Sequence, residues 1–480
     1  MTRRPSRLVV GVLVALAACT GGDNSSESGE GGRATTSAPS STAPAATNPP
    51  GSLPAATEPS CPTIPPRAQP RSDRSRYVLH ADVRPAEGKV EGDLRVAFTP
   101  DLPTDEIVFR LWPNGPRSAA IGTRLDTGPV TVNGAPAPST RADETTLVVD
   151  PGRTMAAGAT VEIALNWVLV VPGSANDRIS REGDAMRLGS FFPILPWEPG
   201  VGWARDAAVG DFAEASTAPT ADFDLTVTVP PGYLVLASGE PAPDNPNHFV
   251  APARRDVAMS VGRFTDLATV VAHAPDPVTV TVGRHDGTPG NANLYLGQVV
   301  DALEAFAERY GPYPWTTLTV AVTPNLGGGI EYPSHIMLGP GTEGEIAVHE
   351  VAHMWFYALV GNDQGRDPWL DEGVTSFAEA NYDRILDYYE QLPITRMAQG
   401  ELGQPMSFWT ERPFAYQDGV YNQGVQALIA LGPPDLVDCA LRVYVAQNAY
   451  RIATPADFVA AAAAVFPDAA KKLAIFGVEP

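Results

Sequence analysis

The stretch His349-Glu350-Val351-Ala352-His353, followed eighteen residues later by Glu372, decides how this sequence is interpreted. In a helix, His349 and His353 lie one turn apart on the same face, so both imidazoles can reach one small cation. Glu350 lies about 100° further round the helix, where it can hold a water molecule beside the cation without being a ligand. A catalytic zinc site needs a third protein ligand and an open fourth position. We expect Glu372, on a second helix, to be that third ligand.

The motif is unusual for this composition, because the chain contains only 7 histidines in 480 residues. Chance alone would place His-Glu-x-x-His in roughly one such chain in a hundred. An ordinary surface helix with two solvated histidines is the alternative for these five residues. The surrounding residues count against that alternative, because Met354-Trp355-Phe356 follow the second histidine and Trp369-Leu370-Asp371 precede Glu372.

With these flanking residues the sequence resembles the aminopeptidase N type of zinc metallopeptidase, the gluzincins. Their signature is H-E-x-x-H, eighteen residues, then E, with W-F after the second histidine and W-L-[ND]-E-G around the distant glutamate. The resemblance implies a peptidase with one zinc ion per chain, bound by His349, His353 and Glu372, and with Glu350 as general base. It also implies that Glu379, two turns after Glu372, accepts a hydrogen bond from a ligand histidine. A plain surface glutamate is the alternative for Glu379.

A glycine-rich segment lies close before the motif and reads Gly327-Gly328-Gly329-Ile330-Glu331-Tyr332. Glycines let a backbone approach a ligand closely, and a strand edge here would allow an extended peptide to pair. The segment resembles the family's G-x-M-E-N element, whose carboxylate receives the free α-amino group of the substrate. Gly328 and Glu331 match, whereas Ile330 and Tyr332 replace Met and Asn. The resemblance implies that Gly328, Gly329 and Glu331 bind substrate, and a turn with a solvated glutamate is the alternative.

Two other short segments bear on the site. Tyr421-Asn422-Gln423-Gly424 resembles the family's Y-x-K-G element, with Gln423 in place of Lys. It implies that Tyr421 is the catalytic tyrosine that stabilises the oxyanion, and a core tyrosine is the alternative. Thr342-Glu343-Gly344-Glu345 has the form of a capping box and predicts that the zinc helix begins a few residues before His349.

The N-terminal part of the chain has the features of an export signal and a tether. Residues 1–19 contain Arg3, Arg4 and Arg7, an apolar run, and the ending Leu16-Ala17-Ala18-Cys19, which resembles a bacterial lipobox. We therefore expect a lipoprotein signal peptide, export, and a lipid anchor at Cys19 on the outer face of the membrane. A plain secretory signal cut near Ala18 is the alternative. Residues 20–71 are rich in Ser, Thr, Ala, Gly and Pro, which predicts a disordered tether.

The remaining sequence predicts an α+β multidomain fold. Alternating and β-branched runs predict an antiparallel β domain over residues 72–268, similar to the saddle-shaped N-terminal domain of the family. Residues 269–432 mix strands and helices, which the resemblance identifies as a thermolysin-like α/β zinc peptidase domain. Residues 433–480 predict a short helical segment in place of the long C-terminal domain of typical members, so we expect an open cleft.

Three smaller predictions concern local structure. Residues 293–310 have helical spacing, with Leu294, Leu296, Val299, Leu303 and Phe306 expected to point inward. The aromatic-proline run at 191–197 is either a loop facing the cleft or a packed core turn. With Cys19 assigned to lipid, Cys61 and Cys439 form an even pair in an exported protein, which favours a disulfide over two free thiols.

The net charge and the motifs together limit the classes of function that this chain can have. The formal net charge is −22, with no Lys/Arg cluster, which argues against nucleic acid or anionic lipid as a partner. We expect peptide substrates and zinc-dependent removal of N-terminal residues. One alternative is a zinc endopeptidase, or another amide hydrolase that needs no free N-terminus. Another is a non-catalytic, peptide-binding surface lipoprotein. Relatives supply a second amine-binding residue from the β domain, for which Glu198 is a candidate, and the oligomeric state stays open.

Overall fold

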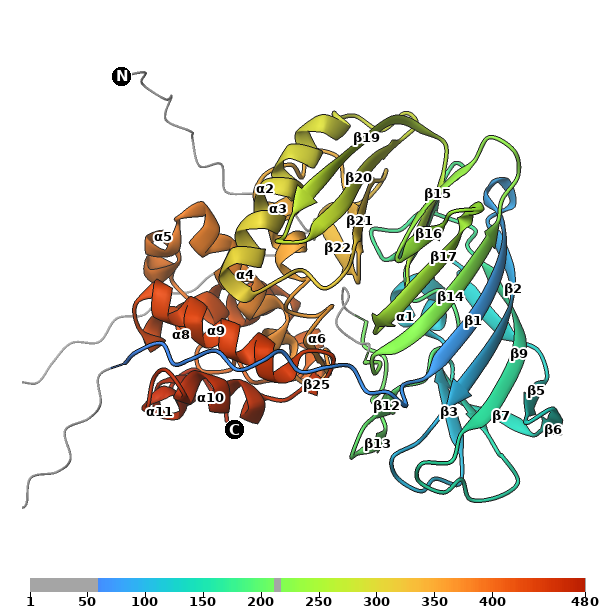
Figure 1. The fold of residues 1–480 in the computed structure, drawn as a ribbon, viewed down its shortest axis with the longest axis horizontal. Helices are drawn as coiled ribbons and strands as arrows, with labels where there is room; N and C mark the ends of the chain where they lie inside the picture. The colour runs from blue at the N-terminus through green and yellow to red at the C-terminus, as the bar shows by residue number, and fades with distance from the viewer. Residues whose placement is uncertain (1–58, 211–216, 480) are drawn as a thin grey trace, which may run out of the picture. The chain divides into compact units, whose positions relative to one another are not determined.

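The computed structural model describes residues 59–210 and 217–479. The predicted signal peptide, Cys19 and the tether up to residue 58 lie outside these residues. None of the helices in this described part has both the length and the hydropathy of a membrane-spanning segment. The described residues contain a β region, a five-stranded sheet with helices, and a C-terminal group of helices (Figure 1), so the expected α+β fold class is confirmed.

The β region is built on one large sheet, in the order β16-β17-β14-β1-β2-β9-β5-β6 with β4 also pairing β9. Its strands are β1 (Arg76–Arg84), β2 (Lys89–Phe98), β4 (Arg124–Thr127), β5 (Val130–Val132), β6 (Ala135–Ala137), β9 (Val161–Val170), β14 (Ala221–Thr228), β16 (Glu240–Ala242) and β17 (Asn245–Arg254). Buried and exposed residues alternate along β1 and β9, so one face of the sheet carries the core.

One strand pair departs from the predicted antiparallel sheet. β1 and β14 are parallel, with Tyr77 opposite Phe223 and Leu79 opposite Leu225. The prediction of an antiparallel domain is therefore wrong at this pair. A parallel pair cannot be closed by a tight hairpin, and here the connection is the long chain segment between β1 and β14.

Smaller elements complete the β region. A four-stranded sheet has the order β10-β11-β18-β15, a three-stranded sheet the order β3-β8-β7, and β12 pairs β13. The bounds are β3 (Ile107–Arg110), α1 (Pro116–Ala120), β7 (Ser139–Asp143), β8 (Thr146–Val149), β10 (Ile179–Glu182), β11 (Ala185–Leu188), β12 (Trp197–Glu198), β13 (Gly202–Trp203), β15 (Leu234–Ala237) and β18 (Met259–Gly262).

The aromatic-proline run at 191–197 is a packed core turn and not a loop facing a cleft. Phe191, Phe192 and Leu195 are fully buried. The ring of Phe191 packs edge-on against Trp167 and Phe192, with centroids 5.9 and 5.0 Å apart. These contacts place the run in the core of the β region.

A second sheet begins directly after β18. Its order is β19-β20-β21-β23-β22, with bounds β19 (Phe264–His273), β20 (Pro277–His285), β21 (Thr317–Val322), β22 (Gly329–Tyr332) and β23 (His335–Leu338). β20, β21 and β23 are parallel, while β19 and β22 run antiparallel at the two edges. Arg263 separates β18 from β19, and the predicted domain boundary at residue 268 stays a prediction.

Helices cover this second sheet and continue to the C-terminus (Figure 1). They are α2 (Ala292–Tyr310), α3 (Glu345–Ala352), α4 (Glu372–Asp383), α5 (Leu386–Gln391), α6 (Met406–Thr410), α7 (Pro413–Tyr416), α8 (Gln423–Leu431), α9 (Pro434–Asn448), α10 (Pro455–Ala463) and α11 (Ala469–Ala474), and β24 (Gly361–Asn362) pairs β25 (Ile452–Ala453). Apolar residues of α9 to α11 share one continuous core with α2, α3 and α4. The segment after residue 433 therefore packs as part of the zinc-motif region.

One inward residue of α2 is predicted wrongly. Leu296, Val299, Leu303 and Phe306 are buried, but Leu294 is 47% exposed. Leu294 precedes Leu296 by two positions, which places it roughly 200° round the helix, on the opposite face.

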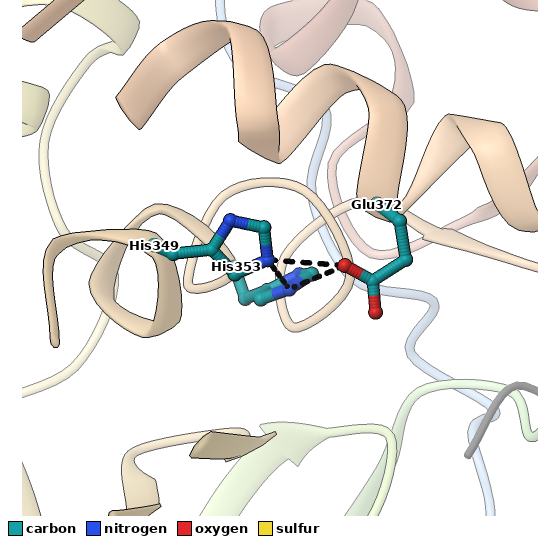
Figure 2. A group of neighbouring side chains, drawn as sticks. All are labelled: His349, His353 and Glu372. Carbon is teal, nitrogen blue, oxygen red and sulfur yellow. Dashed lines mark hydrogen bonds and ion pairs between the residues drawn. The ribbon is translucent and has the colours of Figure 1, made fainter. Parts of the chain in front are cut away.

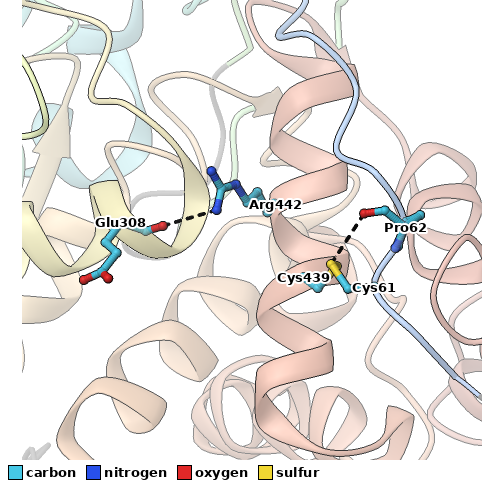
Figure 3. Close-up of a disulfide and its surroundings, with 5 residues drawn as sticks. All are labelled: Cys61, Pro62, Glu308, Cys439 and Arg442. Atoms are coloured by element: carbon cyan, nitrogen blue, oxygen red, sulfur yellow. Dashed lines mark hydrogen bonds between the residues drawn. A yellow bond between two sulfur atoms is a disulfide. The ribbon is translucent and has the colours of Figure 1, made fainter.

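The last residues of the predicted tether are held against α9. Cys61 forms a disulfide with Cys439 (Figure 3), and the Ala68 amide donates to the Ala446 carbonyl at 2.7 Å. Ile64 and Ala68 pack on the core. The prediction of disorder up to residue 71 is therefore wrong for residues 59–71, because a covalent link and buried apolar contacts fix them.

Candidate metal centre

The helix α3 carries the first half of the zinc motif. Gly344 is its N-cap, with φ 106°, and α3 begins at Glu345, a few residues before His349 as expected. The predicted capping box does not form, because the Thr342 hydroxyl donates to the Gly339 carbonyl at 2.7 Å. The last helical residue is Ala352, and His353 caps the helix with α-helical dihedral angles. The two histidines therefore keep the one-turn spacing that the motif requires.

The second half of the motif lies at the start of α4, whose first residue is Glu372. The buried Trp369, in the turn before it, packs edge-on against Phe458 with centroids 5.0 Å apart. Gly373 lies against Gly424 of α8, and a Cβ added to Gly424 would be 2.5 Å from the Gly373 Cα. The backbones of α4 and α8 thus touch at two glycines, which gives a packing reason for both.

Three side chains converge as the spacing predicts (Figure 2). The Oε2 atom of Glu372 lies 3.0 Å from Nε2 of His349 and 3.4 Å from Nε2 of His353. The two Nε2 atoms are 3.1 Å apart. Ligands at zinc distances in a tetrahedral arrangement lie about 3.3 Å from one another. The three donor atoms therefore fit one zinc ion.

The charges of the site also fit a cation. The carboxylates of Glu331, Glu350, Asp371, Glu372 and Glu379 are all no more than 5% exposed. Burial alone would raise the pKa of Glu372, but the adjacent imidazoles of His353 and His349 hold it well below its usual range. Such a density of buried carboxylates around two imidazoles is stabilised by a bound divalent cation.

The outer nitrogen of each imidazole has its own partner. Nδ1 of His349 lies 3.2 Å from Oε2 of Glu379. Nδ1 of His353 lies 2.8 Å from Oδ1 of Asp371 and 3.1 Å from the Phe356 carbonyl. With the proton on Nδ1, the lone pair of each Nε2 faces the point where the three ligands meet. Asp371 is missed by the sequence analysis, although it stands directly before Glu372 in the motif.

Glu350 occupies the expected place beside the ligands. It lies so close to Gly329 that a Cβ atom at residue 329 would overlap Cγ and Oε1 of Glu350. No described residue hydrogen-bonds its Oε2 atom. Burial raises the pKa of Glu350 to about 8, although the imidazoles of His353 and His349 oppose the shift. The structure thus assigns Gly329 a close contact with Glu350, whereas Gly328 faces open space.

Glu331 lies on β22, the edge strand of the five-stranded sheet. It is 5% exposed, and its Oε1 atom has no hydrogen-bond partner in the described part of the chain. Burial raises its pKa to about 7, against the opposing effect of His353. Glu331, Glu350 and His353 form a second group that lies close enough to hold an ion. The first group fits zinc better, because it supplies two imidazole nitrogens where the second supplies one.

Tyr421 lies in a π-helical segment, Gln417–Asn422, that leads into α8. Its ring is nearly parallel to that of His349, with centroids 6.1 Å apart and an interplanar angle of 20°. Gln423, which replaces the family's Lys, is 3% exposed. Its amide donates to the Ala398 carbonyl and accepts from the Gly400 amide, both at 2.8 Å. Gln423 therefore joins α8 to the loop before α6.

Glu198 is buried and ion-paired. Its two carboxylate oxygens accept from Nη1 of Arg366 at 3.1 and 3.3 Å. Burial raises its pKa, and the charge of Arg366 opposes the shift. These contacts tie Glu198 to Arg366, and its candidate role in binding an amine stays a prediction.

Comparison with known sequences finds aminopeptidases that are similar to about a third of this chain. No family model matches the chain. It is 26% identical over 208 residues to aminopeptidase B of Homo sapiens, covering 37% of this chain and 32% of that protein. It is 26% identical over 190 residues to aminopeptidase N of Oryctolagus cuniculus, covering 33% of this chain and 19% of that protein. The chain thus spans about a third or less of the length of these relatives.

Comparison with solved structures covers most of the chain. The M1 zinc metallopeptidase from Deinococcus radiodurans is 19% identical, with a TM-score of 0.63 over 85% of this chain and 94% of that chain. A mutant of that enzyme bound to a Tyr-Ser-Ala substrate gives a TM-score of 0.64 at 20% identity over the same shares. The chain therefore has the fold of the M1 zinc metallopeptidases, and His349, His353 and Glu372 meet within it.

Proposed function

We propose that this protein is a zinc metallopeptidase that removes N-terminal residues from peptides. The observation that carries the proposal is the convergence of His349, His353 and Glu372, with Glu350 and Glu331 buried beside them. The aminopeptidases among the relatives and the substrate-bound M1 structure support the same reaction class.

His349, His353 and Glu372 would hold one zinc ion per chain. When bound, zinc acts as a Lewis acid that polarises the scissile carbonyl and acidifies water. Glu379 and Asp371 fix the orientation of the two imidazoles through their Nδ1 atoms.

Glu350 acts as the proton carrier of the reaction. Its carboxylate removes a proton from the attacking water and delivers it to the nitrogen of the departing peptide. The absence of a hydrogen-bond partner for Oε2 among the described residues leaves that oxygen available to the water. Its side chain packs against Gly329, where a Cβ atom would displace it.

Tyr421 stabilises the developing oxyanion. The ring lies alongside that of His349, one of the three ligand residues. A phenol that donates to the charge that forms in the transition state can contribute roughly 3 kcal/mol.

Glu331 determines where the peptide is cut. Its buried carboxylate, with one oxygen that no described residue satisfies, suits the α-ammonium group of a substrate. β22 is the edge of its sheet, so an extended peptide can pair with it as an added strand. A substrate held by its N-terminus in this way would be cleaved after its first residue.

The test is hydrolysis of a matched panel of free and N-acetylated peptides by the zinc-loaded protein. We expect cleavage of the free peptides only, and loss of nearly all turnover in Glu350→Gln with zinc retained. Glu345→Gln, the same change at an exposed residue of α3, is the control and should keep wild-type turnover. Equal cleavage of acetylated peptides would favour the endopeptidase alternative. Full activity in Glu350→Gln would refute the proposed chemistry.

We also infer that the protein is exported and anchored to the membrane by lipid on Cys19. The sequence Leu16-Ala17-Ala18-Cys19 after an apolar run supports this inference. The test is detergent phase partitioning of the wild type and of Cys19→Ala, expressed with the full N-terminus. The wild type should enter the detergent phase and the variant should not, and identical partitioning of the two would contradict the anchor.

A further inference from the structure

Glu331 and Tyr332 are neighbours on β22, and consecutive side chains of a strand point to opposite sides. Within residues 59–210 and 217–479, β22 has one neighbouring strand, β23, and lies at the edge of the sheet. Hydrogen bonds to a single strand fix the edge on one side only. The position of the Glu331 carboxylate therefore also depends on the contacts that the Tyr332 side chain makes on the opposite face of the strand.

Tyr332 is fully buried against the β region. Its hydroxyl oxygen accepts from Nη1 of Arg178 at 3.2 Å and lies 3.1 Å from Oγ of Ser190. The phenol fits only because residue 189 is glycine, since a Cβ atom there would overlap the Tyr332 hydroxyl. The pocket for the ring is thus built by residues before and after β11.

The hydrogen bonds continue to a buried carboxylate. Oγ of Ser190 donates to Oδ2 of Asp256 at 2.9 Å, so the Tyr332 hydroxyl is the donor to Ser190. Asp256 is 4% exposed, and its Oδ1 accepts from the Val257 amide at 2.7 Å. Arg178 thus donates to the Tyr332 hydroxyl, which donates to Ser190, and Ser190 donates to Asp256.

The loop that leads into β22 is held by the same part of the β region. The Gly327 amide donates to Oδ1 of Asn176 at 2.8 Å. Nη2 of Arg187 donates to the Asn325 carbonyl at 3.0 Å. Residues 176–190 therefore contact the loop before β22 as well as Tyr332 at its end.

We propose that Tyr332 is a positioning residue that fixes the Glu331 carboxylate for recognition of the substrate's N-terminus, through its hydrogen bonds to Ser190 and Arg178. This inference rests on the proposed function. It assigns a role to the residue at which the sequence departs from the family's G-x-M-E-N element. The β region would then contribute to substrate recognition, because its hydrogen bonds hold β22 in place.

The test compares Tyr332→Phe, which removes the hydrogen bonds of the phenol with Ser190 and Arg178, and Ser190→Ala, which removes those of the serine with Tyr332 and Asp256. Each should raise KM for free N-terminal substrates about five- to tenfold, because the hydrogen bond between Tyr332 and Ser190 is lost in both, with kcat changed less than about twofold. Tyr313→Phe is the matched control. It also removes a buried hydroxyl, which donates to the Thr317 carbonyl at 2.9 Å, and it should leave KM unchanged.

A double-mutant cycle separates positioning from a general loss of stability. In a Glu331→Gln background, Tyr332→Phe should have no further effect on KM, because the carboxylate it positions is gone. If Tyr332→Phe lowers only the melting temperature and leaves KM unchanged, the inference is overturned. An equal rise in KM in the Glu331→Gln background would also overturn it, since Tyr332 would then act by another route.

Binding of leucine amide, measured by calorimetry on the Glu350→Gln variant, distinguishes failure of the inference from failure of the proposed function. If the wild type cleaves neither free nor acetylated peptides, the proposed function fails. Weaker binding of leucine amide after Tyr332→Phe would then still support the positioning role. Unchanged binding, or no binding to the parent variant, would contradict it.

Discussion

The side chain of Glu350 lies directly against Gly329, with no room for a Cβ atom between them. The two residues belong to α3 and to the edge strand β22, so the proposed general base lies against a strand that also carries Glu331. The glycine-rich segment therefore provides space for the side chain of Glu350.

Gly329→Ala should lower kcat by at least about tenfold, because the added methyl group must displace Glu350 or β22 from a close-packed position. Zinc content should stay unchanged, since no zinc ligand is touched. Gly297→Ala in α2 is the matched control, because a Cβ atom there meets none of the described residues and Gly297 has no role in the site. Steady-state kinetics of the two variants decide the point, and equal activity in both would contradict the assigned contact.

Tyr421→Phe should lower kcat by roughly 10²- to 10³-fold with little change in KM, because in the proposed mechanism the hydroxyl acts on charge that develops in the transition state. Tyr388→Phe, at a tyrosine that is 51% exposed, is the control. A change confined to KM in Tyr421→Phe would show that the hydroxyl binds substrate and does not stabilise the oxyanion.

Gly424→Ala should destabilise the protein by about 1–3 kcal/mol, because the new methyl group would press on the Gly373 backbone of α4. The displacement of α4 should also weaken zinc binding through Glu372. Gly297→Ala, within α2 and facing open space, should instead stabilise by about 0.5–1 kcal/mol. Urea denaturation of both variants measures the difference, and opposite signs are expected.

His335 makes stability depend on pH. Burial lowers its pKa to about 3, and its two ring nitrogens lie 3.0 Å from Oγ of Ser260 and 2.7 Å from Oγ1 of Thr319. An unfolded histidine binds a proton below about pH 6.5, so between that pH and 3 the unfolded state binds more protons and stability falls as pH falls. The slope for one such group is about 1.4 kcal/mol per pH unit.

His335→Gln should remove this contribution. Its free energy of unfolding should decrease less steeply than that of the wild type between pH 6.5 and 4, although it starts lower at neutral pH. His273→Gln, at an exposed histidine, should keep the wild-type slope. Identical slopes for wild type and His335→Gln would show that His335 is not held neutral.

The parts of the site that depend on local spacing could be predicted from the sequence. His349 and His353 share a helix face because four residues make about one turn, and flanking aromatic residues indicate where Glu372 stands. The parts that depend on contacts between distant elements could not. Neither the fit of Glu350 against Gly329 nor the link from Tyr332 to Ser190 leaves a pattern in the local sequence.

The same distinction explains the wrong predictions about the fold. Thr342 matches a capping box in sequence, but its hydroxyl donates to Gly339 and Gly344 becomes the N-cap. Leu294 is apolar but lies on the exposed face of α2. Residues 59–71 have the composition of a tether, yet the disulfide to Cys439 and the contacts with α9 hold them in place.

The zinc content of the purified protein tests the central claim most directly. Elemental analysis should find about one zinc per chain in the wild type and in Glu350→Gln, because three ligands remain in both, and far less in His353→Ala. A wild type that binds no zinc after incubation with excess metal, or a His353→Ala variant that retains a full equivalent, would contradict the account.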